Sequence, residues 1–205
     1  MAGPTTLIIC YPMRLILASH SPRRQELLRR AGFVFEVRPS QIEEVLRPGE
    51  TAEDFACRAA QEKALDVAAS CQPDTLILGA DTVVVVNGEL LGKPREAEDA
   101  RRMLRLLSDC THRVITGVCL VRAPQEIKAL KYETTAVTFR HLDEEEIQSY
   151  LTSGEPFDKA GAYGIQGLAS RFVTRVEGCY FNVVGLPVAL VYEILKPFLK
   201  TDVSG

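Results

Sequence analysis

A single apolar run restricts the folds that are open to this chain. Residues 76–86 read LILGADTVVVV, and nine of these eleven residues are apolar or glycine. A run of this length, rich in β-branched side chains, predicts a strand at the centre of a sheet that is buried on both faces. The Asn87 and Gly88 pair that follows favours a tight turn into a second strand through Leu90 and Leu91. We therefore expect a sheet built around residues 76–86.

Hydrophobic spacing and capping signals divide the rest of the chain between helices and strands. Thr51 and Asp143 are expected to be helix N-caps, with Asp54 and Glu146 three residues on as capping partners. Residues 40–50 form a carboxylate-rich loop in this prediction. Helices are predicted at residues 22–31, 51–69, 97–107, from 143 onward and at 187–199, and strands at 15–18, 33–37, 113–121, 129–140 and on both sides of 177–178. The fold class is α/β, a mixed sheet with helices on its faces.

Length and composition exclude several classes of protein. The chain has 205 residues, 46% of them hydrophobic and 25% charged, which excludes disordered and low-complexity classes. We expect residues 13–205 to form a single domain and residues 1–12, which precede the first clear strand, to be an extension. No run of 18 apolar residues and no signal peptide are evident in the sequence, so we expect no membrane partner.

Charge and cysteine content bear on partners and compartment. The 24 basic and 27 acidic residues give a net charge of −3, whereas proteins that bind long nucleic acids are usually basic. Six scattered cysteines without a C-x-x-C pair, together with three histidines, disfavour a zinc site and favour a reducing, cytoplasmic compartment. Any anionic ligand would need a local cluster of cations.

Asp81 and Thr82 are the two polar residues of the apolar run. A carboxylate in a buried strand must be paired, protonated or bound to a metal, because its desolvation otherwise costs several kcal/mol. Ligands of α/β proteins often lie at the ends of central strands, which favours a functional site here. The alternative is a strand-end aspartate whose carboxylate reaches water.

A second candidate lies between the first predicted strand and helix, where the sequence reads Ser-His-Ser-Pro-Arg-Arg over residues 19–24. Free N–H groups at a helix N-terminus attract anions, and hydroxyl and guanidinium donors suit phosphate oxygens. Arg23 and Arg24 would oppose the helix dipole, so a purely structural role explains them poorly. An exposed arginine pair with no ligand is the alternative.

The other candidates are weaker when each is taken alone. Lys63 falls on the small-residue face of its helix, where a lysine that extends to water is the simpler interpretation. Lys93 stands before a proline after the predicted hairpin and is either a positioned cation or part of a turn. Glu43 and Glu44 could be metal ligands, although a lone carboxylate pair is more often solvated.

Residues 158–167 read DKAGAYGIQG, with three glycines, a tyrosine and a glutamine. Glycines at this density suggest a close backbone approach or unusual backbone angles, and the aromatic ring and amide could bind a nucleotide base. A mobile surface loop is the alternative. The G-x-G-x-x-G and G-x-x-x-x-G-K-[ST] phosphate motifs are absent from the sequence, which disfavours a dinucleotide enzyme or a P-loop ATPase.

Taken together, these segments resemble the Maf family of nucleoside triphosphate pyrophosphatases over residues 13–199. The resemblance rests on LASHSPRR, Arg58-Ala59, Lys63-Ala64, GADT, Lys93-Pro94, Thr116-Gly117, DKAGAYGIQG and NVVGLP. It implies an elongated mixed sheet flanked by helices, in two lobes with a central cleft, the Maf/ITPase-like fold, and often a homodimer. The small residue usual between the two serines is His20 here, at a position that we do not expect to be essential.

Within that family, residues 158–167 resemble the branch that hydrolyses dTTP and UTP. The branch that acts on 7-methyl-GTP typically has a Cys-Ala-Gly-Ser segment and an acidic residue in place of Gln166. The resemblance makes Asp81 the proton acceptor and ties Arg23, Thr82 and Gln166 to substrate choice. A glutamine amide complements the N3–H and O4 of uracil or thymine, but it also complements guanine.

The resemblance also implies a mechanism, in which water attacks the α-phosphorus to give a nucleoside monophosphate and pyrophosphate. Mg²⁺ or Mn²⁺ is the expected cofactor, with Glu44 and Asp81 as its ligands. The expected catalytic residues are Asp81, Glu44, Lys63 and Lys93, and the expected substrate-binding residues are Ser19, Ser21, Arg23, Arg24, Thr82 and Gln166. The role would be housecleaning, with modified pyrimidine nucleotides as further substrates. A 7-methyl-GTP pyrophosphatase and a nucleotide-binding regulator of septum formation remain alternatives.

Overall fold

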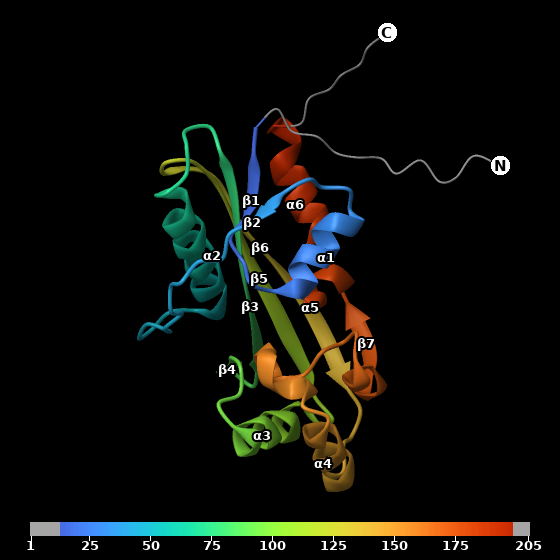
Figure 1. The fold of residues 1–205 in the computed structure, drawn as a ribbon. Helices are drawn as coiled ribbons and strands as arrows, with labels where there is room; N and C mark the ends of the chain where they lie inside the picture. The colour runs from blue at the N-terminus through green and yellow to red at the C-terminus, as the bar shows by residue number, and fades with distance from the viewer. Residues whose placement is uncertain (1–12, 199–205) are drawn as a thin grey trace, which may run out of the picture.

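The apolar run forms β3 (Leu76–Val86), around which the sheet is arranged (Figure 1). The computed structural model describes residues 13–198, whose strands form one mixed seven-stranded sheet in the order β2-β1-β3-β5-β6-β7, with β4 paired to β3. β1 is parallel to β2 and β3, and the other pairings are antiparallel. The remaining strands are β1 (Leu15–Leu17), β2 (Glu36–Val37), β4 (Glu89–Leu91), β5 (Thr111–Arg122), β6 (Glu126–Phe139) and β7 (Val173–Glu177).

One edge of β3 is interrupted in its middle. β1 pairs with residues 76–78 of this edge, and β4 pairs with residues 84–86. No described strand pairs with this edge over residues 79–83, although the opposite edge is paired with β5 over residues 76–85. The gap separates two lobes that the long strands β3, β5 and β6 join, as the elongated outline in Figure 1 shows.

Helices cover both faces of the long strands. The upper lobe in Figure 1 contains β1 and β2, and the lower lobe contains β4. Helix α2 packs on one face of the upper lobe, and α1, α5 and α6 pack on its other face. Helices α3 and α4 lie in the lower lobe. Short 3-10 turns η1 (Glu155–Asp158), η2 (Ala160–Ala162) and η3 (Leu168–Phe172) connect the lower lobe, and η4 (Lys196–Phe198) follows α6. The helices are α1 (Pro22–Arg30), α2 (Ala52–Ala68), α3 (Ala97–Leu107), α4 (Glu144–Thr152), α5 (Tyr180–Val184) and α6 (Val188–Leu195).

Helix α2 lies unusually close to the sheet because glycines face it. A Cβ added at Gly79 would come within 2.1 Å of the Ala60 carbonyl oxygen, and one at Gly117 within 2.2 Å of the Ala56 carbonyl oxygen. Any larger side chain at these positions would push the helix away from the strands. The close approach brings the polar side chains of α2 within reach of β3.

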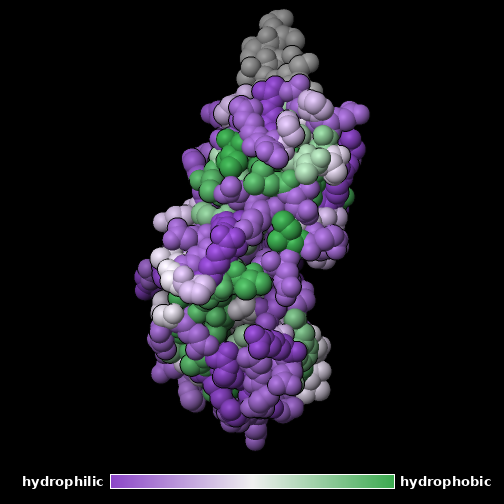
Figure 2. Space-filling model, turned by 90° about the vertical axis from the view of Figure 1, so that its left-hand side faces the viewer, coloured by the Kyte–Doolittle hydropathy of each residue, from purple (hydrophilic) through white to green (hydrophobic). Residues whose placement is uncertain are grey.

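Most of the predicted elements are confirmed. Thr51 Oγ1 accepts from the Asp54 N–H at 3.1 Å, and Asp143 and Glu146 form a complete capping box. The strand predicted at residues 33–37 is shorter, since only Glu36 and Val37 pair with β1. The surface of the face shown in Figure 2 mixes hydrophilic and apolar side chains, with apolar patches in both halves of the molecule.

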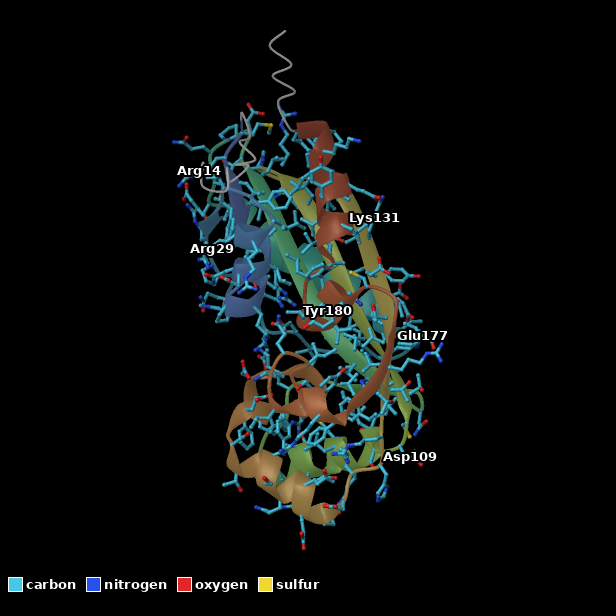
Figure 3. All side chains as sticks on the ribbon, turned by 90° about the vertical axis from the view of Figure 1, so that its right-hand side faces the viewer. Arg14, Arg29, Asp109, Lys131, Glu177 and Tyr180 are labelled. Carbon is cyan, nitrogen blue, oxygen red and sulfur yellow. The ribbon has the colours of Figure 1, made fainter. Side chains whose placement is uncertain are left out.

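One predicted strand is wrong. The aromatic and β-branched residues after Gly178 form helix α5 and not a second strand. The buried Asn182 explains the difference, because its amide Nδ2 donates to the Val114 carbonyl at 2.9 Å and to Thr135 Oγ1 at 3.0 Å. These tertiary contacts outweigh local strand propensity. Figure 3 shows the segment from Glu177, at the end of β7, to Tyr180, at the start of α5, beside the long strands.

No helix within residues 13–198 is both long and apolar enough to cross a membrane. The extension predicted at residues 1–12 lies outside the described residues.

Candidate active site

A cleft of about 1440 Å³ opens between the two lobes, at the gap in the edge of β3. The expected two-lobed architecture with a central cleft is therefore confirmed. The cleft brings together segments from both lobes that are far apart in the sequence. All ten site residues predicted from the sequence line it: Ser19, Ser21, Arg23, Arg24, Glu44, Lys63, Asp81, Thr82, Lys93 and Gln166.

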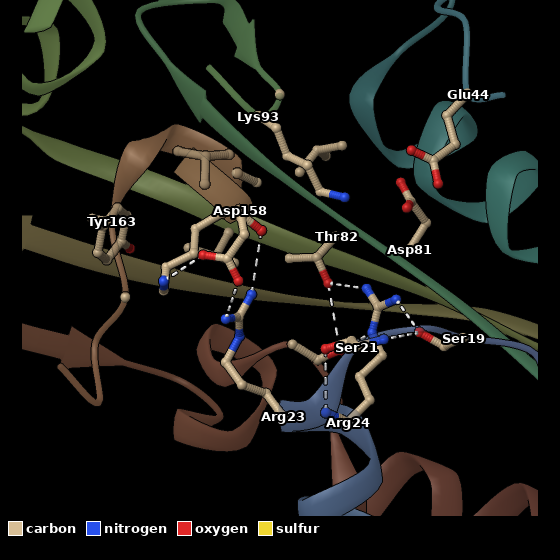
Figure 4. A pocket seen from close by; sticks show the side chains of 18 of the residues that line it. Ser19, Ser21, Arg23, Arg24, Glu44, Asp81, Thr82, Lys93, Asp158 and Tyr163 are labelled. Carbon is tan, nitrogen blue, oxygen red and sulfur yellow. Dashed lines mark hydrogen bonds and ion pairs between the residues drawn. The ribbon is translucent and has the colours of Figure 1, made fainter. Parts of the chain in front are cut away.

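Asp81 lies on the face of β3 that α2 covers. The residue is 7% exposed, and Lys63 Nζ donates to its Oδ1 at 2.7 Å. Lys63 also forms an ion pair with Glu44, so one ammonium contacts two carboxylates. Burial raises the pKa of Asp81 above its usual value, although Lys63 opposes this shift. Figure 4 shows the Glu44 and Asp81 carboxylates pointing toward one another. The arrangement is a buried carboxylate with a raised proton affinity at the cleft.

The loop that carries Glu44 has no helix or strand, as predicted, and α2 holds it at both ends. At its start, the Ser40 hydroxyl donates to Asp66 Oδ2 at 2.7 Å. At its end, Arg58 donates to both carboxylate oxygens of Glu50, at 2.6 and 2.7 Å, and to the Val45 carbonyl at 2.8 Å. The bonds from Arg58 lower the pKa of Glu50 to about 2. Arg58 thereby fixes the segment that presents Glu44.

Thr82 lies on the opposite face of β3, beside α1. Arg24, 8% exposed, donates to Thr82 Oγ1 at 2.9 Å and to the Ala80 carbonyl at 2.8 Å. It also donates to the Gly185 carbonyl at 2.8 Å and to Ser19 Oγ at 3.2 Å. Four of its five N–H groups are thus directed at protein acceptors. Arg24 joins α1, β3 and the end of α5 at the floor of the cleft.

The helix that carries Arg24 begins in the cleft. Ser21 is its N-cap, and the Ser21 hydroxyl accepts from the Arg24 N–H at 3.4 Å. Arg23, one residue earlier, crosses the cleft and donates to Asp158 Oδ2 at 2.9 Å. His20 lines the cleft beside these residues and is exposed.

The glycine-rich segment is folded into short turns and packed against the lower lobe. Gly161 has a φ of +68°, and its N–H donates to the Gly92 carbonyl at 3.0 Å. A Cβ at Gly161 would meet Val84 at 3.0 Å, which explains why glycine stands there. Gln166 is exposed in this segment and lines the cleft. Lys93, next to Gly92, directs its amine into the cleft (Figure 4).

Four residues at the site received no role from the sequence. Arg58 and Glu50 fix the Glu44 loop, Asp158 pairs with Arg23, and the Glu155 carboxylate accepts from the Leu168 N–H at 2.9 Å beyond Gln166. Asp158 and Arg58 stand in the segments that carry the family resemblance, so a signal for them was present. Glu50 and Glu155 act through contacts with partners that sequence spacing does not reveal.

Comparisons with known proteins identify similar sequences over most of the chain. The family model described as Maf-like protein matches residues 14–198. A dTTP/UTP pyrophosphatase of Koribacter versatilis is 53% identical over 90% of this chain and 94% of its own length. One from Shigella sonnei is 50% identical, over 90% of this chain and 92% of its own. A crystal structure of a dITP/XTP pyrophosphatase from Mycobacterium abscessus has a TM-score of 0.39 and 17% identity, over 62% of this chain and 73% of that one.

Proposed function

The chain belongs to the Maf family, and we propose that it is a nucleoside triphosphate pyrophosphatase that hydrolyses dTTP and UTP to the nucleoside monophosphate and pyrophosphate. The observation that carries this proposal is the buried Asp81 carboxylate at the gap in β3, in a cleft that cations from both lobes line. The relatives named dTTP/UTP pyrophosphatase support the choice of substrate, since they are at least 50% identical over about nine-tenths of the chain.

In the proposed reaction, water attacks the α-phosphorus. The new bond joins the water oxygen to that phosphorus, and the bond from the phosphorus to the α,β-bridging oxygen breaks. Pyrophosphate leaves with the electron pair, and Asp81 accepts the proton of the attacking water. Asp81 is placed for this role because it is buried and lines the cleft. Lys63 holds the Asp81 carboxylate in one orientation.

Cations around the cleft are proposed to bind the triphosphate. Lys93 and Arg23 come from opposite lobes and line the cleft. They would stabilise the charge that develops on the leaving pyrophosphate. Arg24 adds positive charge from the floor of the cleft, and the hydroxyls of Ser19 and Ser21 are placed to donate to phosphate oxygens.

A divalent cation, Mg²⁺ or Mn²⁺, is the proposed cofactor. The Glu44 and Asp81 carboxylates both contact Lys63 Nζ, so they lie close enough to share one cation. Within residues 13–198 no group of three or more His, Cys, Asp or Glu side chains gathers. Two carboxylates nevertheless fit Mg²⁺, which is usually held by one or two carboxylates together with substrate phosphates and water. When bound, the ion would neutralise phosphate charge.

The base is proposed to meet Gln166. Its amide can accept from N3–H and donate to O4 of uracil or thymine. Thr82 and Arg23 are the other residues proposed to govern substrate choice.

We further propose a homodimer in the cytoplasm with a housecleaning role, in which modified pyrimidine nucleotides would also be substrates. Sedimentation equilibrium of the purified chain tests the dimer, which a monomer mass would contradict.

A substrate panel tests the activity. UTP, dTTP, CTP, ITP and 7-methyl-GTP are supplied in turn with Mg²⁺, and monophosphate and pyrophosphate are quantified. We expect UTP and dTTP to have the highest kcat/KM and the two products to form in equal amounts. Release of inorganic phosphate alone would contradict the proposed site of cleavage, and a preference for 7-methyl-GTP would contradict the proposed substrate.

A further inference from the structure

Arg23 has an ion-pair partner from the opposite lobe. It lies in the first turn of α1, where the helix dipole disfavours a positive charge and the turn itself contains no acidic residue. Arg23 Nη1 donates to Asp158 Oδ2 at 2.9 Å, and Nη2 lies 3.5 Å from the Asp158 carbonyl oxygen. Figure 4 shows these two contacts side by side. The pair joins α1 to η1, so it connects the two walls of the cleft.

The second oxygen of Asp158 is held from below. Lys159 Nζ donates to Asp158 Oδ1 and to the Glu155 carbonyl, both at 2.6 Å. The Lys159 side chain passes over Gly164, where a Cβ would come within 2.6 Å of its Cε atom. The Glu155 carboxylate accepts from the Leu168 N–H at 2.9 Å. Gln166 therefore lies between Gly164, which the Lys159 side chain covers, and Leu168, which Glu155 binds.

Stability alone does not account for this arrangement. The Asp158 side chain is 63% exposed, and exposed ion pairs contribute about 0.2–1 kcal/mol to the free energy of unfolding. The pair also constrains geometry, because it links the start of α1 to the segment that presents Gln166. A displacement of about 1 Å between substrate-binding groups can cost about 100-fold in rate.

We propose that Asp158 is a positioning residue for nucleotide selection. Asp158 binds Arg23 of one lobe and Lys159 of the other, beside the segment that carries Gln166. It thereby fixes the distance between the groups that bind the triphosphate and the base. A nucleotide whose base and phosphates match this distance engages both lobes together. The inference rests on the proposed pyrophosphatase function.

The test compares Asp158→Asn with a matched control, Asp74→Asn. Asp74 is also 63% exposed and also pairs with an arginine, Arg122, but it does not line the cleft. Initial rates with UTP, dTTP and 7-methyl-GTP give kcat and KM for each variant, and thermal unfolding gives Tm. For Asp158→Asn we expect KM for UTP and dTTP to rise about tenfold, with a similar loss of selectivity over 7-methyl-GTP and a much smaller change in kcat. Asp74→Asn should match the wild type.

Two results with Asp158→Asn would overturn the proposal. If Asp158→Asn keeps the wild-type KM and selectivity, whatever its Tm, the pair is merely structural and the proposal is overturned. A lower KM in Asp158→Asn also overturns it, because Asp158 would then compete with phosphate for Arg23. If the wild type hydrolyses none of the three nucleotides, the proposed function fails, which is distinct from the failure of this inference.

Discussion

Asp81 and Thr82 are neighbours in β3, yet their side chains bind helices on opposite faces of the sheet. Asp81 accepts from Lys63 of α2 at 2.7 Å, and Thr82 accepts from Arg24 of α1 at 2.9 Å. Successive residues of a strand always point to opposite faces, and a sheet normally keeps them apart. Here the edge of β3 is free between β1 and β4, so one cleft reaches both residues.

Replacing Asp81 by Asn should abolish turnover without unfolding the protein. The amide has the same shape as the carboxylate but does not accept a proton from water. We expect kcat for UTP to fall by about 100- to 10,000-fold, with a smaller change in KM. Pyrophosphate release from UTP measures kcat, and circular dichroism checks the fold. Turnover comparable to the wild type would exclude Asp81 as the general base.

Arg24→Lys should reduce stability more than an exposed substitution of the same kind. Lysine cannot reproduce the planar donor pattern that reaches Thr82, Ala80 and Gly185, so buried acceptors lose their partners. We expect the free energy of unfolding in urea to fall by about 2–4 kcal/mol. Arg29→Lys is the control, since Arg29 is exposed and its guanidinium donates to Gln25 across one helical turn and lies over the Phe35 ring, with no buried acceptor. Equal effects of the two substitutions would contradict the proposed role of Arg24 in the floor of the cleft.

The sequence predicted the central strand from a local signal, and the ten lining residues from local signals together with the family resemblance. An apolar run interrupted by Asp81 stands out in a linear sequence, and so do arginines at a helix start. The gap in the edge of β3 has no such signal. The gap depends on where the pairing of β1 with β3 ends and the pairing of β4 with β3 begins, which only the register of these pairings decides.

The error at α5 and the unassigned residues have a common physical origin. Asn182 is buried and bonded to β5 and β6, and Glu50 is bonded to Arg58, so each acts through a distant partner. The same holds for Arg24, whose sequence context indicated a ligand for phosphate. Its contacts show a residue that also holds the floor together. Local patterns identify which side chains are unusual, and tertiary contacts decide what each one binds.

Glu50→Gln should loosen the loop that presents Glu44. The substitution removes the charge that Arg58 pairs with, and the Glu50 carboxylate also accepts from the Arg47 N–H at 3.1 Å. Loss of about 1.4 kcal/mol of this interaction would increase local opening about tenfold. Cleavage after Glu44 by endoproteinase Glu-C, followed by mass spectrometry, measures the opening. Cleavage at the wild-type rate would show that Arg58 and Glu50 do not restrain the loop.

Removal of divalent cations should stop the reaction, and Glu44 should set the cation requirement. EDTA is expected to abolish release of pyrophosphate from UTP, and added Mg²⁺ or Mn²⁺ to restore it. For Glu44→Gln, the Mg²⁺ concentration that gives half-maximal rate should rise about tenfold or more. Glu43→Gln is the control, because Glu43 also lines the cleft but forms no ion pair with a described residue. An equal shift in both variants would remove Glu44 as a cation ligand.

His112 should make the protein less stable in mild acid. The ring is buried between Phe139 and Tyr163, and burial lowers its pKa from 6.5 to about 4. Below pH 6.5 the unfolded chain therefore binds a proton that the folded chain does not, so stability falls until about pH 4. Between pH 7.5 and pH 5 this removes about 2 kcal/mol from the free energy of unfolding. His112→Gln should lack that loss in urea titrations at the two pH values, whereas His141→Gln, at an exposed position, should retain it. An unchanged acid dependence in His112→Gln would assign the loss to other groups.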